Sequence, residues 1–275
     1  MSFNIGSTNF GQIYVGSTRI GEVYVGSVKV YPDSAPDPYN PLNLPAYTMR
    51  IVYIDNYTPS FRTGVTGVQV SASPNVWDVT YRYPIWNNGV LRLNNEYGAY
   101  GGKDKVLQVL GANTQGVTSM TELFRQCTSL TDIVLFDTNS VTDMSYMFTG
   151  CDDLTSVPLY VTSSVTNMYA MFSGCNSLET CPLFDTHLVT SFYEMFMNCT
   201  HLTAIPQLNI DSATTLRTMF DNCRLVETGI TAFYQLGIAR ESSYERLDYQ
   251  ACFRSCGVDT VTGSAELAQI PSSWK

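Results

Sequence analysis

Charged side chains and histidines are scarce in this chain. Charged residues make up 14% of its 275 residues, and only two residues are histidine. No stretch approaches the roughly 18 consecutive apolar residues that a membrane-spanning helix needs. With 44% hydrophobic residues, the composition is that of a globular protein and not of a disordered one. We therefore expect no membrane insertion and a packed core.

Basic residues are almost missing from one part of the chain. Between residues 113 and 228 there are twelve acidic residues and only three basic ones, Arg125, Arg217 and Arg224. The rest of the chain holds twelve acids and twelve bases, so this tract carries the whole net charge of −9. Nucleic acids and anionic lipids bind through neutralisation of their phosphates by Lys and Arg. The tract is therefore unsuited to either ligand.

The first residues contain neither a basic segment nor an apolar run, so we expect no signal peptide and folding in a cytoplasm. Eight cysteines are present, and in that compartment they are expected to stay reduced. Five of them recur at a fixed spacing, and side chains that stack in register have poor geometry for a disulfide. We predict buried thiols that fill a core.

A 24-residue repeat runs through the acidic tract. Its pattern is V-T-x-M-x-x-M-F-x-x-C-x-x-L-x-x-I-x-L, and a constant period of roughly 20 to 50 residues is typical of a solenoid. Solenoids present a broad surface and usually bind partners. The repeats start at Val117, Val141, Val165, Val189 and, in degraded form, Ala213, with one column of Phe124, Phe148, Phe172, Phe196 and Phe220 and another of Cys127, Cys151, Cys175, Cys199 and Cys223.

Each repeat is expected to hold one short helix and one strand. Within Met144–Cys151, apolar residues fall at i, i+3, i+4 and i+7, the spacing of one helix face. Thr142 or Asp143 is available as the helix cap. Leu154–Leu159 then follows the L-x-x-V-x-L pattern of a leucine-rich-repeat strand. A single unit buries too little apolar surface to fold alone, so the units must stack.

Residues 1–31 repeat the pattern Ile/Val-Gly-Ser every ten residues and predict a meander of very short strands with Gly-Ser hairpin turns. Strands this short bury little by themselves. We expect them to form an attachment or oligomerisation module, with Tyr14, Val15, Tyr24 and Val25 making the contacts.

The chain as a whole is predicted to be mixed α+β. A Pro-rich linker over 32–45 leads to a small β-sandwich-like domain over 46–112, where strand patterns alternate with turn residues. The leucine-rich-repeat solenoid follows over 113–228. Residues 229–275 are expected to form a capping region, with a last modified rung and an inserted helix from Thr231 to Ala239.

The repeat pattern over residues 117–226 resembles the BspA-like leucine-rich repeats of bacterial surface proteins and phage proteins. The opening Ile13–Thr18, Val23–Ser27 and Val30–Pro32 resembles the amino-terminal repeats of phage tail or fibre proteins. Val68–Tyr81 and Ala265–Trp274 resemble segments of the same proteins. The resemblance implies a virion structural protein, an appendage of a tail or head, from a phage of gut-type bacteria. It also implies a homo-oligomer, by analogy with fibres a trimer.

From this resemblance we expect a non-enzymatic virion protein that is assembled in the host cytoplasm. Residues 1–31 would contact other virion proteins, and the solenoid would adhere to a glycan or protein of the host surface. Two alternatives remain open: a purely structural decoration that binds no receptor, and a secreted bacterial BspA-like surface adhesin. An enzyme such as a depolymerase is the weakest hypothesis, because no pair of carboxylates stands out from the acidic tract.

One column of the repeats is the candidate ligand-binding surface. Phe136, Tyr160 and Phe184 each follow a leucine that we expect to point inward, so strand alternation should turn all three outward. Exposed aromatic rings beside Asp137 and Asp185 would suit stacking on sugar rings or anchoring of a protein. The alternative is a structural role, in which these rings pack against the β domain or a symmetry mate.

Other chemistry has little support in the sequence. Asp185 lies two residues before His187, but no nucleophile motif or second ligand cluster accompanies the pair. The paired Asp152 and Asp153 lack the oxygen-ligand spacing of a calcium loop. We therefore predict no catalytic residue, no metal site and no cofactor.

Overall fold

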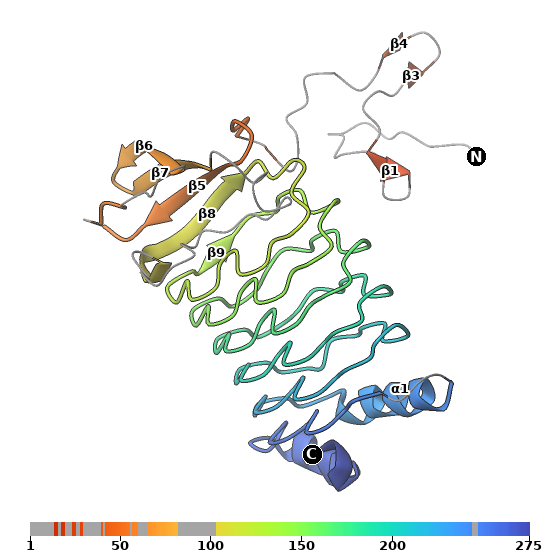
Figure 1. The fold of residues 1–275 in the computed structure, drawn as a ribbon. Coiled ribbons are helices and arrows are strands. Elements are labelled where there is room, and N and C mark those ends of the chain that lie inside the picture. Colours follow the sequence, from red (N-terminus) through yellow and green to blue (C-terminus); the bar gives the residue numbers. More distant parts are fainter. Residues whose placement is uncertain are drawn as a thin grey trace.

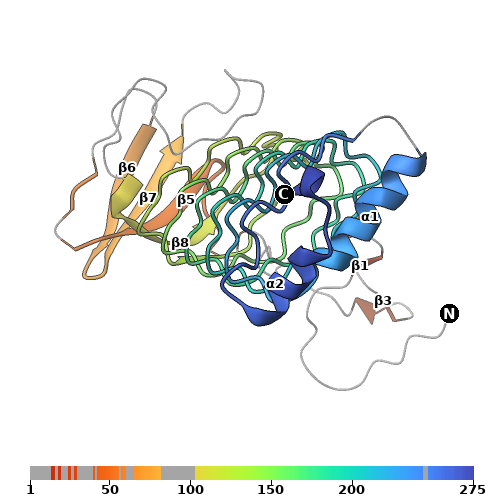
Figure 2. The same ribbon diagram turned by 90° about the horizontal axis from the view of Figure 1, so that it is seen from below.

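The structure is a computed structural model that describes residues 40, 42–55, 57–59, 65–81, 103–243 and 247–275, together with four two-residue strands before residue 30. Stacked repeats form the centre of the molecule, with a small sheet at one end and helices at the other (Figures 1 and 2). Most of the predicted linker over 32–45 lies outside the described residues.

Two hairpins of very short strands are present before residue 30, as predicted. In each hairpin two residues separate the antiparallel strands, which is the commonest hairpin loop length. The contacts predicted for Tyr14, Val15, Tyr24 and Val25 stay a prediction. The strands are β1 (Tyr14–Val15) with β2 (Thr18–Arg19), and β3 (Tyr24–Val25) with β4 (Val28–Lys29).

A five-stranded mixed sheet precedes the repeats, in the order β6-β7-β5-β8-β9. Its last strand, β9, already belongs to the first repeat and pairs in parallel with β8, whereas the other neighbours are antiparallel. The strands are β5 (Thr48–Tyr53), β6 (Val65–Ala72), β7 (Asn75–Tyr81), β8 (Val106–Ala112) and β9 (Asp132–Ile133), and the short 3-10 helix η2 (Lys103–Lys105) precedes β8.

The sandwich predicted for residues 46–112 is wrong for the described residues. Met49, Ile51 and Tyr53 lie two residues apart on β5 and are buried in the same hydrophobic cluster as the repeats. The sheet therefore shares its core with the solenoid, and β9 continues the sheet into the first repeat (Figure 1). The sheet closes one end of the array.

The helix predicted in each repeat is also wrong, and tight turns take its place. In the first repeat the N–H of Leu123 donates to the carbonyl of Met120 (3.1 Å), and the N–H of Cys127 donates to that of Phe124 (3.0 Å). The third residue of each turn has a positive φ, 60° at Glu122 and 66° at Gln126. An α-helix cannot contain such residues. Apolar side chains three and four apart still face inward, because two successive four-residue turns share that spacing with a helix.

Hydrogen bonds between rungs explain why each repeat forms tight turns and not the predicted helix. The N–H groups of Met120, Glu122 and Phe124 donate to carbonyls of the next repeat at 2.8 to 3.0 Å. These donors would otherwise serve a helix. One parallel bridge per rung continues this ladder from Ser119 to Asp248.

The phenylalanine and cysteine columns form the core, as predicted. Phe124 to Phe220 stack from rung to rung with ring centroids 5.5 to 5.6 Å apart. Every cysteine is free, and seven of the eight are buried. The thiol of Cys175 donates to the carbonyl of Phe148 on the preceding rung at 3.1 Å, and the neighbouring cysteines repeat this bond. Burial raises the pKa of Cys127 to about 12.

The far end of the array is covered by the C-terminal segment. Phe253 stacks on Phe220 as a sixth member of the column at 5.9 Å, and Phe233 on the helix packs edge-on against both. Trp274 then stacks on Tyr249 at 4.1 Å. The predicted helix and modified last rung are confirmed. The elements are α1 (Ile230–Ser243), α2 (Val261–Ala268) and the 3-10 helix η3 (Ser272–Trp274).

Candidate functional site

The predicted aromatic column lies inside the protein. Phe136, Tyr160 and Phe184 have exposed fractions of 0%, 2% and 5%, whereas Leu159 and Leu183 have 59% and 65%. The predicted inward and outward residues are therefore exchanged. The three aromatic rings pack against the central phenylalanine column and cannot meet a ligand.

Proline in the later repeats is incompatible with the predicted strand, although the first repeat, with Val134 at that position, buries Phe136 in the same way. Pro158 and Pro182 precede the two exposed leucines, and a proline fixes φ and removes a ladder donor. Only the first repeat forms a strand here, and the later repeats have none. Without a strand the side chains do not alternate with a period of two. Val157 and Tyr160, three residues apart, point inward instead.

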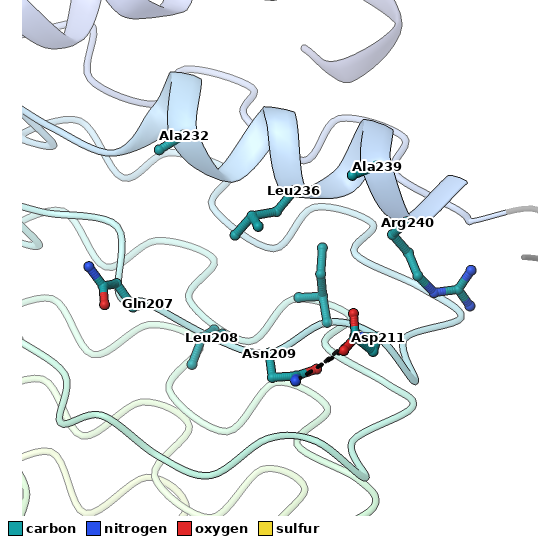
Figure 3. A pocket seen from close by; sticks show the side chains of 9 residues that line it. Gln207, Leu208, Asn209, Asp211, Ala232, Leu236, Ala239 and Arg240 are labelled. Carbon is teal, nitrogen blue, oxygen red and sulfur yellow. Dashed lines mark hydrogen bonds between the residues drawn. The ribbon is translucent and has the colours of Figure 1, made fainter. Parts of the chain in front are cut away.

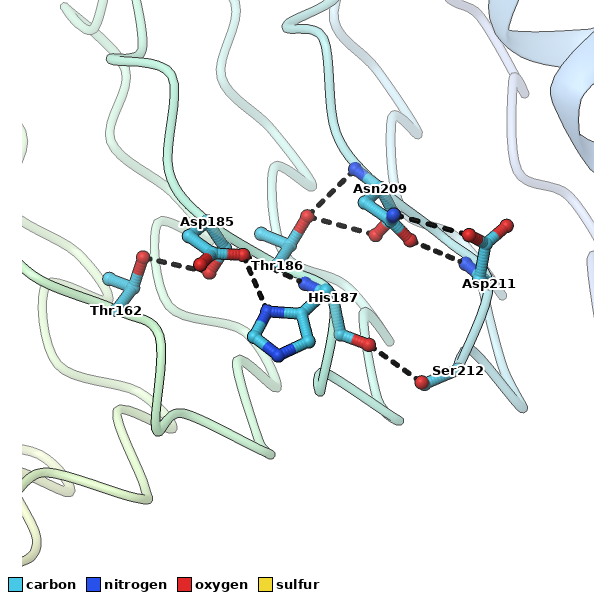
Figure 4. A network of polar contacts seen from close by, with 7 residues as sticks. All are labelled: Thr162, Asp185, Thr186, His187, Asn209, Asp211 and Ser212. Carbon is cyan, nitrogen blue, oxygen red and sulfur yellow. Dashed lines mark hydrogen bonds and ion pairs between the residues drawn. The ribbon is translucent and has the colours of Figure 1, made fainter. Parts of the chain in front are cut away.

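The two predicted acids do lie at the surface, but they hold turns together. The carboxylate of Asp137 accepts the backbone N–H of Asn139 at 2.9 Å. Asp185 pairs in the same way with His187, whose ring Nδ1 lies 2.7 Å from the carboxylate. This contact holds the pKa of Asp185 below its usual range. Figure 4 shows that the pair belongs to a chain of polar contacts along the rungs.

The same network continues through buried threonines. The hydroxyls of Thr162 and Thr186 each donate to a carbonyl of the next rung, those of Asp185 and Asn209, at 2.8 Å (Figure 4). The bonds recur at the same place in earlier rungs. Side chains used in this way stabilise the corner of the solenoid.

The structure presents a different aromatic column at the surface. Tyr146, Tyr169 and Tyr193 lie on three consecutive rungs and are each partly exposed. Their ring centroids are 4.6 Å and 5.0 Å apart, and the rings meet edge to face. A hydrogen bond with the Tyr146 side chain, followed by partial burial, raises the pKa of Tyr169 above its usual range.

Arginines lie at both ends of these rings. The guanidinium carbon of Arg125 lies 5.1 Å from the centre of the Tyr146 ring, within the range of a cation–π contact. Arg217 follows Tyr193 by one period, and the bridge between Ser191 and Thr215 puts the two on adjacent rungs. We call Arg125, Tyr146, Tyr169, Tyr193 and Arg217 the tyrosine strip.

Short polar residues hold the strip in place. The side chain of Asn167 accepts the backbone N–H of Tyr169 at 3.1 Å, and Thr215 accepts that of Arg217 at 3.2 Å. Each contact ties a residue to the N–H two positions later, a local turn that Asn, Asp, Ser and Thr favour. The strip is thus fixed by the same repeated turn that displaces the predicted helix.

Sequence reasoning missed the strip because its tyrosines occupy variable positions of the repeat. The consensus directs attention to residues that all units share, and those form the core. The signal that could have found the strip is an aromatic residue at nearly the same variable position of three consecutive units. Two of the three bases in the acidic tract, Arg125 and Arg217, were a second signal.

An open groove of about 760 Å³ lies between the last full repeat and α1 (Figure 3). One wall is formed by residues 207–211 and the other by Ala232, Leu236 and Ala239 on α1. Leu236 is 48% exposed. The groove occurs where a further rung would continue the stack, because α1 leaves the array at this point. Its apolar wall makes it a second exposed feature of the array.

Within the described residues no three His, Cys, Asp or Glu side chains come together in a way that could hold a metal ion. None of the helices in that part of the chain is both long enough and apolar enough to span a membrane.

Residues 118–233 match the family model described as a Mycoplasma protein of unknown function, DUF285. A leucine-rich repeat protein from Eubacterium ventriosum is similar in structure over 48% of this chain, with 16% identity and a TM-score of 0.31, and the match spans 36% of that protein. No curated protein matches the chain. The stacked 24-residue rungs themselves fit a leucine-rich-repeat-like protein of unknown function, and none of these comparisons indicates a phage or virion role.

Proposed function

We propose that this chain is a non-enzymatic binding protein that attaches to a cell surface through the tyrosine strip. The observation that carries the proposal is the composition of the strip. Three tyrosines and two of the three basic residues of the acidic tract gather on one file of consecutive rungs. Together with tryptophan, tyrosine and arginine are the residues most enriched in binding hot spots.

The rest of the array supports this assignment. Its core columns are buried to 0% and its corner hydrogen bonds are satisfied within the stack. Residues at positions that differ from rung to rung are not needed for this packing and can serve recognition. The strip lies at such positions.

The setting that we propose is a phage virion, with residues 1–31 attached to other virion proteins and the repeats directed outward. Its support is the sequence resemblance of residues 13–32 to tail and fibre proteins, which also underlies the expected trimer. Purified particles of a phage that encodes this chain should contain it, as detected by mass spectrometry. Its absence from such particles, with secretion by a bacterium, would favour the surface-adhesin alternative.

Binding of the labelled full-length chain to a panel of gut bacteria tests the attachment. Replacing Tyr146, Tyr169 and Tyr193 together by Ser should reduce saturable binding by at least about tenfold, since such hot-spot residues contribute about 2 kcal/mol or more. The matched control replaces three exposed leucines, Leu159, Leu183 and Leu236, by Ser.

The outcomes distinguish binding through the tyrosine strip from binding through the leucines and from a purely structural role. Loss of binding only in the tyrosine variant supports the strip, with folding checked by circular dichroism. Loss only in the leucine variant would move the site to the leucines and the groove. If the unaltered chain binds no cell, the purely structural alternative is favoured.

A further inference from the structure

We infer that the ligand of the tyrosine strip is an uncharged glycan chain that lies along the axis of the array. The inference rests on the proposed function and adds the chemical class of the ligand. It follows from the spacing of the rings, the charge balance of the strip and the kind of residue that flanks it.

The rings form a track that follows the repeat. Their centroids are 4.6 Å and 5.0 Å apart, close to the strand spacing of about 4.8 Å that sets the rise per rung. From Arg125 to Arg217 the strip crosses four such steps, about 19 Å in all. Neighbouring rings are inclined by 72° and 66°, so a linear polymer of sugar rings would stack the C–H face of one unit on one tyrosine ring and lay the units before and after it against the edges of the neighbouring rings.

Charge favours an uncharged occupant. The acidic groups next to the strip are Glu122, which pairs with Arg125 at 2.5 Å, Glu194, which follows Tyr193, and Asp143, which lies three residues before Tyr146 and accepts the backbone N–H of Ser145. With two bases against three acids the strip is close to neutral, while the whole tract carries a net charge of −9. An anionic polymer would be repelled by the tract, and a cationic one would meet the guanidiniums at both ends. A neutral polymer is repelled neither by the acidic tract nor by the guanidiniums.

The flanks favour a sugar over a protein. An exposed threonine lies three or four positions before each tyrosine. The hydroxyl of each one donates a hydrogen bond to a backbone carbonyl of the preceding rung. These threonines are Thr142, Thr166 and Thr190. Among the described residues, Leu188, two positions before Thr190, is the exposed large aliphatic residue nearest in sequence to these threonines, and the others lie in other segments. A protein interface needs an apolar core around its anchors. Aromatic rings bordered by hydroxyls instead match a ligand whose C–H faces alternate with hydroxyls.

Arg217 supplies the polar end of the track. The structure gives its guanidinium no hydrogen-bond or ion-pair partner within the described residues, in contrast to Arg125 with Glu122. A guanidinium has five N–H donors in a fixed plane. We assign Arg217 the role of donating to neighbouring hydroxyls of the sugar next to Tyr193, with the Glu194 carboxylate as an acceptor for a further hydroxyl.

The test is binding of the full-length protein to immobilised neutral polysaccharides (a glucan, a mannan and a galactan) and to acidic ones (a polyuronate and a polysialate). We expect saturable binding of a neutral polymer that persists at high salt, since it does not depend on charge. Tyr169→Ala and Arg217→Met should each weaken it by at least about tenfold. Tyr169→Phe keeps the ring and should retain most of the affinity.

Leu159→Ser with Leu183→Ser is the matched control and should leave glycan binding unchanged. If cells bind but no neutral polymer does, or if only an acidic polymer binds and salt abolishes it, the ligand class is wrong while the proposed attachment stands. If cells bind and protease treatment of the cells removes the ligand, a protein receptor replaces the glycan. If neither cells nor polymers bind, both the inference and the proposed function fail.

Discussion

The ladder of buried thiols should make this protein unusually sensitive to alkali. Seven cysteines are buried, and burial raises the pKa of each above its ordinary value, to about 12 for Cys127 and further for Cys151 and Cys175. The unfolded thiol has a pKa of about 8.5. Below that pH both states hold the proton and stability is unaffected. Above it only the unfolded state releases the proton, so stability falls as pH rises.

The magnitude follows from the number of thiols. Each buried thiol costs slightly under about 1 kcal/mol of stability at pH 9 and between about 1 and 2 kcal/mol at pH 9.5. Seven of them together cost about 6 and about 10 kcal/mol, against a typical total stability of about 5 to 15 kcal/mol. Burial also lowers the pKa of Lys103, which acts in the opposite direction, but one group cannot offset seven.

Urea unfolding in the presence of a reductant, followed by circular dichroism from about pH 7.5 to about pH 9.5, measures the effect. The matched variant replaces Cys151 and Cys175 by Ser, which keeps a hydroxyl donor for the carbonyls of Phe124 and Phe148 but does not titrate. It should start less stable and lose about two sevenths less stability over the same range. An unfolding free energy that stays flat up to pH 9.5, or an equal loss in the variant, would refute the reasoning.

Three further predictions concern the packing. Phe184→Ala should lower the free energy of unfolding by about 3 to 5 kcal/mol in chemical denaturation. Leu183→Ala, at a residue 65% exposed, should lower it by under about 1 kcal/mol. Equal losses would contradict the inward position of Phe184 and the outward position of Leu183. Tyr160→Phe should stabilise the fold by about 1 kcal/mol, because the buried Tyr160 hydroxyl finds no hydrogen-bond partner among the residues that the structure describes. A loss of stability would mean that the hydroxyl is satisfied. Lys103→Met should destabilise the fold by about 1 to 3 kcal/mol. The Lys103 ammonium donates to the Arg125 carbonyl at 2.5 Å, a carbonyl of the first rung, which has no rung before it. Lys105→Met is the control and should leave stability unchanged.

Much of the architecture was predictable because it depends on strict repetition. The Phe124 and Cys127 columns are buried to 0%, since every rung places the same residue over its neighbour. The cap was predictable for the same reason: the Phe and Cys spacing returns at Phe253 and Cys256 after the insertion of α1. The hairpins before residue 30 followed from Gly-Ser between short β-branched runs.

The local conformation of the rung was not predicted. Apolar residues at i, i+3, i+4 and i+7 fit a helix and a pair of tight turns equally well. The deciding signal was Gly150, Gly174, Asn198 and Asn222, which share one column with positive φ. Glycine and asparagine tolerate that region best, and four of them at a constant spacing argue for turns. Pro158 and Pro182 carried the corresponding signal against a strand.

The sequence alone determined that this protein stacks 24-residue rungs around reduced thiols and that the repeats hold all of its net negative charge. Periodicity and charge are properties of the linear chain, so both could be counted without coordinates. Only the tertiary structure decided which side chains face outward, because orientation depends on hydrogen bonds between rungs. Those bonds turned Phe136, Tyr160 and Phe184 into the core and brought Tyr146, Tyr169 and Tyr193 together at the surface.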